Sequence, residues 1–205
     1  MMEQITLSND VTIYKTKYVS PYPLADTLER IKTNVQLNKR TTDDRVHENV
    51  GPGIQSPLIV KCPELDVILD RAVSICKDLH NEKTLGHLIH SWVAISRNDR
   101  TKILWHKHIY FAPPYNFIKT DYTFTYYLQM PDNLSGDDGM LLFKTNDGQI
   151  HKFLPEENDM FIFPPDLDHV VEWNRESTKD RVVVASNITF INQNKNTTQC
   201  IPKIL

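Results

Sequence analysis

The sequence has few cysteines, no long apolar run and no excess of charge of one sign. Its three cysteines (Cys62, Cys76 and Cys200) are odd in number and widely spaced, which argues for reduced thiols rather than a disulfide-bonded secreted domain. No apolar run approaches the roughly 20 residues of a transmembrane helix. The opening residues, MMEQITLSND, lack the charged and apolar regions of a secretory signal. We therefore expect a soluble cytoplasmic protein, in the cytoplasm of a host if the chain is viral.

The charge balance argues against two classes of partner. The chain has 23 basic and 26 acidic residues and a formal net charge of −3. No basic surface of the kind that binds nucleic acid or an anionic membrane is expected from this composition. With 205 residues, of which 40% are hydrophobic, the chain can form one domain with a buried core.

Two segments in the first half have the spacing of amphipathic helices. In Pro23–Leu37 and in Pro63–His80 the apolar residues recur every three or four positions, and each segment begins with a proline. The segment between them, Asn38–Pro57, is polar and contains glycine and proline, so it predicts a mobile loop. We expect this loop to close over a substrate as a lid.

The second half changes to short aromatic and β-branched runs separated by turn signals. Seven such runs predict strands: SWVAISR, KILWHKHIY, YTFTYYLQM, GMLLFKT, DMFIFPP, HVVEW and RVVVASNITF. Short strands joined without helices are typical of a sandwich or barrel. We therefore divide the chain into an N-terminal elaboration over residues 1–90, a β core over 91–192 and a tail over 193–205, together one compact domain.

The run ILWHKHIY (Ile103–Tyr110) contains two histidines two positions apart. Because alternate residues of a strand point to the same face, His106 and His108 are expected to project together. Such a pair could chelate a metal or could be a solvated polar strand face. A third candidate, His169, follows FIFPPDLD and opens a later predicted strand, and Arg181 begins the strand after that.

This order of motifs resembles the Fe(II)/2-oxoglutarate-dependent oxygenases, and within them the prolyl-4-hydroxylase-related group of phages and marine bacteria. WHKH lies where that family has H-x-D/E or, in some branches, H-x-H. TYYLQMP resembles its YYL strand, and GMLLF its strand of small and apolar residues. LPEENDMFIFPPDLDHVVEWN resembles the strand leading to its distal histidine, and RVVVASN the strand that begins with its arginine. The resemblance spans roughly residues 91–190.

The resemblance implies a mainly β (α+β) fold, a double-stranded β-helix or jelly roll, braced here by the N-terminal helices. It implies a dioxygenase that couples decarboxylation of 2-oxoglutarate to oxidation of a second molecule by O2. The simplest expectation is a hydroxylase acting on a peptidyl (prolyl-like) or small-molecule substrate. The substrate class is argued by analogy of fold.

By the same resemblance, Fe(II) is bound by His106, His108 and His169. The family normally has a carboxylate where His108 stands. Either His108 completes a site of three neutral imidazoles, or it turns away and two protein ligands remain. Iron sites of this kind hold the metal on one face and leave positions open for other ligands.

The resemblance also implies a binding site for the far carboxylate of 2-oxoglutarate. Arg181 would bind it, since guanidinium is planar and permanently charged. Tyr127 matches the family position whose hydroxyl shares that carboxylate, and Thr125, on the same strand face, would line the pocket.

Other interpretations of the same residues stay open from the sequence. A three-histidine jelly roll could be a cupin-type dioxygenase or isomerase that does not use 2-oxoglutarate, or a structural module without activity. His169 could cap a turn, and Arg181 could pair with an acidic neighbour at the surface. Tyr127 and Thr125 could be ordinary strand residues, and His151 is expected to be exposed after a turn.

Overall fold

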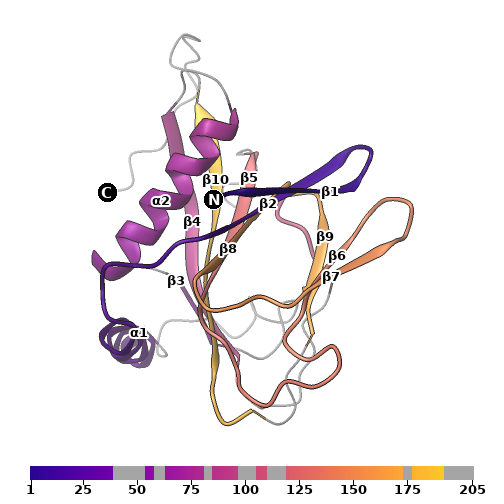
Figure 1. Ribbon diagram of the computed structural model, residues 1–205. Coiled ribbons are helices and arrows are strands. Elements are labelled where there is room, and N and C mark those ends of the chain that lie inside the picture. The colour runs from indigo at the N-terminus through magenta and orange to yellow at the C-terminus, as the bar shows by residue number, and fades with distance from the viewer. Residues whose placement is uncertain are drawn as a thin grey trace.

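In the computed structural model two antiparallel β-sheets face each other, and helices cover the outer side of the larger sheet (Figure 1). The structure describes residues 1–38, 54–57, 63–80, 85–96, 105–109, 119–172 and 177–191. Two facing antiparallel sheets of this kind form a jelly roll. The mainly β fold expected from the sequence is confirmed.

The larger sheet contains seven strands of the described residues in the order β1-β2-β8-β5-β10-β4-β3. Every neighbouring pair is antiparallel. Its strands are β1 (Glu3–Ser8), β2 (Val11–Lys17), β3 (Ile54–Pro57), β4 (Leu85–Ser96), β5 (Tyr122–Gln129), β8 (Asp159–Phe163) and β10 (Arg181–Ile191). The long strands β5 and β10 lie side by side in the middle, so both faces of these strands are buried.

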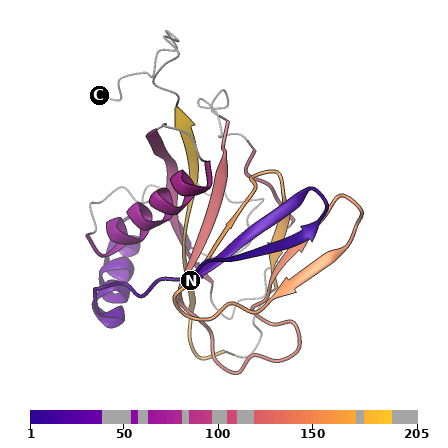
Figure 2. The ribbon, with the colours of Figure 1, turned by 45° about the horizontal axis from the view of Figure 1, so that its top comes forward.

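The smaller sheet has the order β7-β6-β9. Its strands are β6 (Leu141–Lys144), β7 (Ile150–Phe153) and β9 (Asp168–Val171). In Figure 2 this sheet lies on the side of the molecule away from the helices. The smaller sheet therefore covers the inner face of the larger sheet, and the helices cover its outer face.

Helix α2 (Pro63–His80) covers the outer face of the larger sheet, and α1 (Leu24–Asn38) lies next to it (Figure 1). Proline is favoured in the first turn of a helix, where its missing N–H is not needed. The apolar stripe of α2 is buried and packs on Phe124, Tyr126 and Val184 of the sheet. Neither described helix is long and apolar enough to cross a membrane.

Alternate residues of the central strands form a second core on the inner face. Tyr127, Phe161 and Val183 of the larger sheet pack there with Leu141 and Phe143 of the smaller sheet. The inner face is therefore closed by apolar contacts over part of its length, and the side chains at the remaining positions form the site described below.

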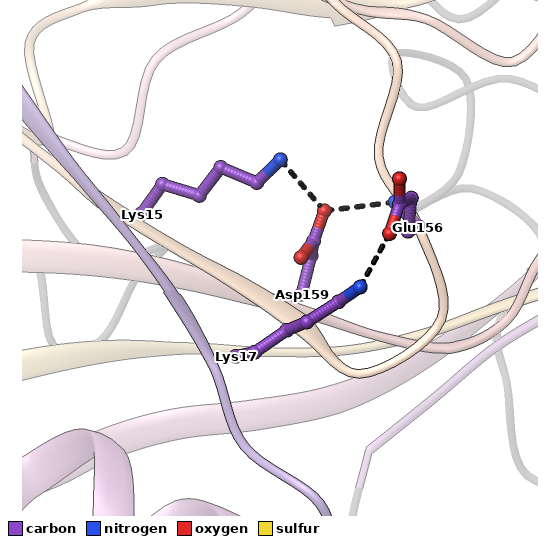
Figure 3. A network of polar contacts seen from close by, with 4 residues as sticks. All are labelled: Lys15, Lys17, Glu156 and Asp159. Carbon is purple, nitrogen blue, oxygen red and sulfur yellow. Dashed lines mark hydrogen bonds and ion pairs between the residues drawn. The ribbon is translucent and has the colours of Figure 1, made fainter. Parts of the chain in front are cut away.

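A network of charged residues connects strand β2 to its neighbour β8 (Figure 3). Asp159 is 1% exposed; its carboxylate forms an ion pair with Lys15 at 2.9 Å and accepts a hydrogen bond from the backbone N–H of Glu156 at 2.8 Å. Lys17 pairs with the Glu156 side chain beside it. A buried carboxylate is costly unless it is paired and hydrogen-bonded, and here both conditions are met.

Several predicted elements are confirmed, and others need correction. Helix α2 has the predicted bounds, and strands β5, β6, β8, β9 and β10 lie in the predicted runs. The loop predicted over Asn38–Pro57 is wrong at its end, where Ile54–Pro57 forms strand β3 by pairing with β4. The rest of that loop, residues 39–53, lies outside the described residues, so the lid remains a prediction. Strands β1, β2 and β3, from the N-terminal 90 residues, belong to the same sheet as β5 and β10.

Candidate metal and co-substrate site

Three histidines meet between the two sheets. One nitrogen from each of His106, His108 and His169 lies within 4.8 Å of the other two. The ring centroids are 4.2 Å apart for His106 and His169, 5.0 Å for His108 and His169, and 5.1 Å for His106 and His108. The structure thus brings together all three residues that the sequence analysis selected as metal ligands.

The local backbone places His106 and His108 on the site without a regular strand. His106 and His169 exchange both of their backbone hydrogen bonds, each at 3.1 Å, as an isolated bridge. The His108 N–H instead donates to the carbonyl of Pro165 at 2.7 Å. The strand predicted over Ile103–Tyr110 is therefore wrong for the described residues 105–109. The facing segment turns at Pro164–Leu167, so it offers no ladder to continue the pairing.

The hydrogen bond and burial of His169 leave it ready to bind a cation. Its Nδ1 lies 3.0 Å from the carbonyl oxygen of Leu167, which can only accept, so Nδ1 carries the proton and Nε2 keeps a lone pair. Burial lowers the pKa of His169 well below its usual value, and the nearby His106 and His108 lower it further. His169 is therefore neutral at pH 7 and able to donate Nε2 to a metal.

Aromatic side chains hold the histidine rings from several sides. Trp92 of β4 stacks on His108, with ring centroids 5.4 Å apart and planes 27° apart. Phe163 of β8 contacts His169 edge-on at 4.8 Å, and Phe143 of β6 lies 6.2 Å from the same ring. The sequence analysis missed Trp92, since nothing in SWVAISR indicates which ring the tryptophan will meet.

A second cluster on the inner face contains buried polar atoms without partners. Three such atoms, Arg181 Nε, Tyr127 Oη and Thr125 Oγ1, have no hydrogen-bond partner among the described residues. The Arg181 guanidinium carbon lies 5.1 Å from the centre of the Tyr127 ring. Burial raises the pKa of Tyr127, while the Arg181 charge and the Thr125 hydroxyl beside it act in the opposite direction. We call these three residues the cradle.

The burial of Arg181 corrects one alternative interpretation. Its side chain belongs to the inner face, and the residue is 5% exposed. An ion pair at the protein surface is therefore excluded for this guanidinium. A buried charge with a donor left unpaired is unfavourable, so the cradle suits an anion that supplies the missing acceptors.

The strand register places the cradle on the same face of the larger sheet as Trp92, which stacks on His108. Arg181 and Ala185 lie on one face of β10, about 13 Å apart at ~3.3 Å per residue. Ala185 is paired with Thr125 on one side and with Trp92, which stacks on His108, on the other. Thr125 thus lies level with Trp92 across the sheet, and Arg181 lies further along the same face of β10.

The remaining candidates have different outcomes. His151 lies on strand β7 and is partly buried, with a buried Nε2 that has no partner among the described residues. The expectation that His151 is an exposed residue after a turn is therefore wrong. The side chains of Cys62 and Cys200 lie outside the described part of the structure.

Two comparisons by sequence give no match. No protein-family model matches the chain, and no curated protein matches it. The fold, by contrast, is the double-stranded β-helix seen in 2-oxoglutarate-dependent iron oxygenases and prolyl hydroxylases. The fold predicted from the motifs is therefore confirmed, and the narrower resemblance to the phage and marine-bacterial group stays a prediction.

Three solved structures illustrate the similarity. The prolyl hydroxylase of Trichoplax adhaerens, in complex with a hypoxia inducible factor peptide, has a TM-score of 0.61 and 15% identity, covering 86% of this chain and 82% of its own. The viral collagen prolyl hydroxylase of Paramecium Bursaria Chlorella virus-1, a 2-oxoglutarate complex, has a TM-score of 0.57 and 12% identity. The match covers 85% of this chain and 94% of that protein. HygX of Streptomyces hygroscopicus, with nickel and 2-oxoglutarate bound, has a TM-score of 0.57 and 11% identity. The match covers 86% of this chain and 82% of that protein.

Proposed function

We propose that this chain is an Fe(II)/2-oxoglutarate-dependent dioxygenase, and specifically a hydroxylase of a peptidyl or small-molecule substrate. One observation carries the proposal. A cluster of three imidazoles contacts Trp92 on the inner face of the larger sheet, and that face also carries Arg181, a buried arginine whose Nε has no partner among the described residues. A molecule with a metal-chelating 2-oxo acid at one end and a carboxylate at the other matches both parts.

His106, His108 and His169 are the residues that would hold the metal. Neutral imidazole suits divalent first-row metals, including iron. The stacking of Trp92 on His108 supports a three-histidine site, because it holds this ring beside the other two. The group contains no carboxylate among the described residues, so the protein ligands contribute no negative charge. We therefore expect weaker metal affinity than at a site with two histidines and a carboxylate.

The cradle would hold the far carboxylate of 2-oxoglutarate. Arg181 Nε and the Tyr127 hydroxyl can each donate a hydrogen bond to it, and both atoms lack a partner among the described residues. Hydrogen bonds that involve a charged group contribute about 1.5–3 kcal/mol each. Since both donors are already buried, little further desolvation opposes binding.

When bound, Fe(II) and 2-oxoglutarate supply oxidation by O2, with 2-oxoglutarate converted to succinate and CO2 and one oxygen atom inserted into a C–H bond of the substrate. The chain's own part is binding and orientation. Trp92, Phe143 and Phe163 surround the histidines with apolar surface and exclude water. Leu167 keeps the proton of His169 on Nδ1, away from the metal.

The test is an anaerobic titration of 2-oxoglutarate into Fe(II)-loaded protein, followed by the visible metal-to-ligand charge-transfer band. We expect the band in wild-type protein, its loss in His106→Ala, and a roughly 10- to 100-fold weaker 2-oxoglutarate affinity in Arg181→Ala, since a hydrogen bond from a charged group is removed. Binding of iron without a band would favour a cupin-type enzyme that does not use 2-oxoglutarate. Failure to bind iron would favour a module without metal chemistry.

A titration of Fe(II) into the apoprotein decides the role of His108. If His108 is a ligand, His108→Ala should weaken Fe(II) binding, and His108→Asp should restore it by supplying the negative charge that the three imidazoles lack. If His108 turns away from the metal, His108→Ala leaves iron affinity unchanged. A metal titration monitored by calorimetry separates the two cases without turnover.

The substrate and the location are further parts of the proposal. Two of the similar structures are prolyl hydroxylases, and one of them binds a peptide, which supports peptides as the first substrates to screen by succinate release. Small molecules are the second class. Cys76 is a free, buried thiol, in line with the cytoplasmic location expected from the cysteine content.

A further inference from the structure

We propose that Asp132 is a positioning residue for Arg181, and so for the far carboxylate of 2-oxoglutarate; this inference rests on the proposed function. Asp132 lies after β5, and its carboxylate contacts the segment that leads into β10. Its Oδ1 lies 2.5 Å from the Ser177 hydroxyl and accepts from the Thr178 N–H at 2.7 Å. Its Oδ2 accepts from the Thr178 hydroxyl at 2.6 Å.

In this contact Asp132 both accepts and donates hydrogen bonds, and Gln129 adds a further one nearby. The backbone N–H of Asp132 donates to the Ser177 hydroxyl oxygen at 3.0 Å, and the Lys179 N–H reaches Oδ1 at 3.2 Å. The Gln129 side chain donates to the carbonyl of Asp180 at 2.6 Å. We call the contacts of Asp132 with residues 177–179 the latch. It ends two residues before Arg181.

The strand pairing explains why Arg181 needs the latch. The register between β10 and β5 begins at Val182 with Gln129 and shifts between Val182 and Val183. Arg181 is paired with Ser96 of β4 but with no residue of β5. On the side where Tyr127 lies, therefore, side chains from the end of β5 replace the missing backbone ladder.

Fixing the backbone before Arg181 has a direct consequence for the cradle. The guanidinium is held over the Tyr127 ring at 5.1 Å, and it would have to meet a carboxylate at hydrogen-bond distance. Hydrogen bonds lose strength steeply when distance and angle depart from their optimum. A latch that sets where β10 begins thus sets where the anion binds, without touching the anion itself.

The test compares Asp132→Asn with Asp147→Asn. Asp147 is a matched control, since its carboxylate also accepts from a hydroxyl, Thr145 at 2.5 Å, and from a backbone N–H, Gln149 at 3.2 Å, but in the β6–β7 turn. Each Fe(II)-loaded protein is titrated anaerobically with 2-oxoglutarate and with 2-oxobutyrate, which keeps the 2-oxo acid but lacks the far carboxylate. The charge-transfer band reports binding of both.

We expect Asp132→Asn to weaken 2-oxoglutarate binding about tenfold, as loss of a supporting partner commonly does, and to leave Fe(II) and 2-oxobutyrate affinities unchanged. Asp147→Asn should change none of them. Equal weakening of both oxo acids, or no difference between the two variants, would overturn the positioning role. If Asp132→Asn does not fold, Thr178→Val removes one exposed contact of the latch and should act in the same direction. Wild-type protein that binds neither oxo acid would overturn the proposed function itself.

Discussion

The two faces of the seven-stranded sheet differ in whether their buried polar groups have hydrogen-bond partners. On the face covered by α2, the Tyr126 hydroxyl lies 2.8 Å from Asn158 Oδ1 and 3.0 Å from the Tyr18 carbonyl oxygen. On the inner face, one residue further along β5, the Tyr127 hydroxyl has no partner among the described residues. Both tyrosines are 0% exposed. One face is complete as it stands, and the other leaves donors available for a ligand.

Buried charges follow the same division. Asp159 is paired with Lys15 where β2 and β8 lie side by side (Figure 3), whereas Arg181 Nε has no partner among the described residues. Unpaired buried polar groups lower stability, so a fold retains them where binding compensates. The difference between the faces therefore supports the proposal that the inner face binds the ligand, on grounds separate from the resemblance.

The largest expected effect comes from removing a histidine of the inner face, compared with removing one on the helix-covered side. His169→Ala should reduce Fe(II) affinity by more than the ~10–100-fold typical of losing an outer-shell partner, since it removes a ligand itself. His80, which stacks on Phe190 at 4.4 Å on the helix-covered side, is the matched control. His80→Ala should cost about 1 kcal/mol of stability and leave iron affinity unchanged, as measured by metal titration and thermal unfolding. Equal iron affinity in both variants would contradict the assignment.

The next effect comes from the two neighbouring tyrosines. Tyr126→Phe should lower the free energy of unfolding by about 1 kcal/mol, because it removes a hydrogen-bonded hydroxyl, and should leave 2-oxoglutarate binding intact. Tyr127→Phe should lose no stability, because its hydroxyl has no hydrogen-bond partner among the described residues, yet weaken 2-oxoglutarate binding about tenfold. Denaturant unfolding of the apoprotein and the anaerobic titration measure the two quantities. Stability loss in Tyr127→Phe alone would reverse the comparison of the faces.

A smaller effect separates paired from unpaired hydroxyls within the inner face. The Thr123 hydroxyl donates to Asn187 Oδ1 at 3.1 Å, whereas Thr125 Oγ1 has no partner among the described residues. Thr123→Val should therefore destabilise the apoprotein by about 1 kcal/mol, and Thr125→Val should not. Thr125→Val should weaken 2-oxoglutarate binding less than Tyr127→Phe, since it removes a neutral group beside the arginine. The same stability loss in both variants would show that Thr125 has a structural partner.

The sequence predicted those parts of the fold and site that depend on local pattern. Helix α2 and strands β5 and β10 have strong periodicity over many residues. The two-residue spacing selected His106 and His108 as a pair, and the resemblance in the order of motifs added His169. Strand β7 was missed because IHKF is short and follows a turn. The prediction of a strand at His106 was wrong because the length of the pairing depends on the turn of a distant segment, Pro164–Leu167.

The roles of Trp92 and Asp132 have no local sign at all. Each depends on a contact between segments far apart in the chain, β4 with the loop of His108 and the end of β5 with the start of β10. A tryptophan in an apolar run and an aspartate in a turn are ordinary residues of their elements. What distinguishes them is the residue opposite, which is set by strand register and becomes visible only with the fold.

The smallest expected effect concerns the pH dependence of the latch at the rim of the inner face. Hydrogen bonds from Ser177 and Thr178 lower the pKa of Asp132. A carboxyl with a lower pKa in the folded state stabilises the fold above its unfolded pKa, 3.8, and loses that contribution as the pH falls toward the folded value. Wild-type apoprotein should therefore lose melting temperature more steeply than Asp132→Asn between about pH 4 and about pH 2. The difference should be small because the carboxylate is exposed to solvent, which weakens its interactions. Parallel melting curves for the two proteins would mean that the latch carries no charge-dependent stability, and would leave its neutral hydrogen bonds as the whole of its structural contribution.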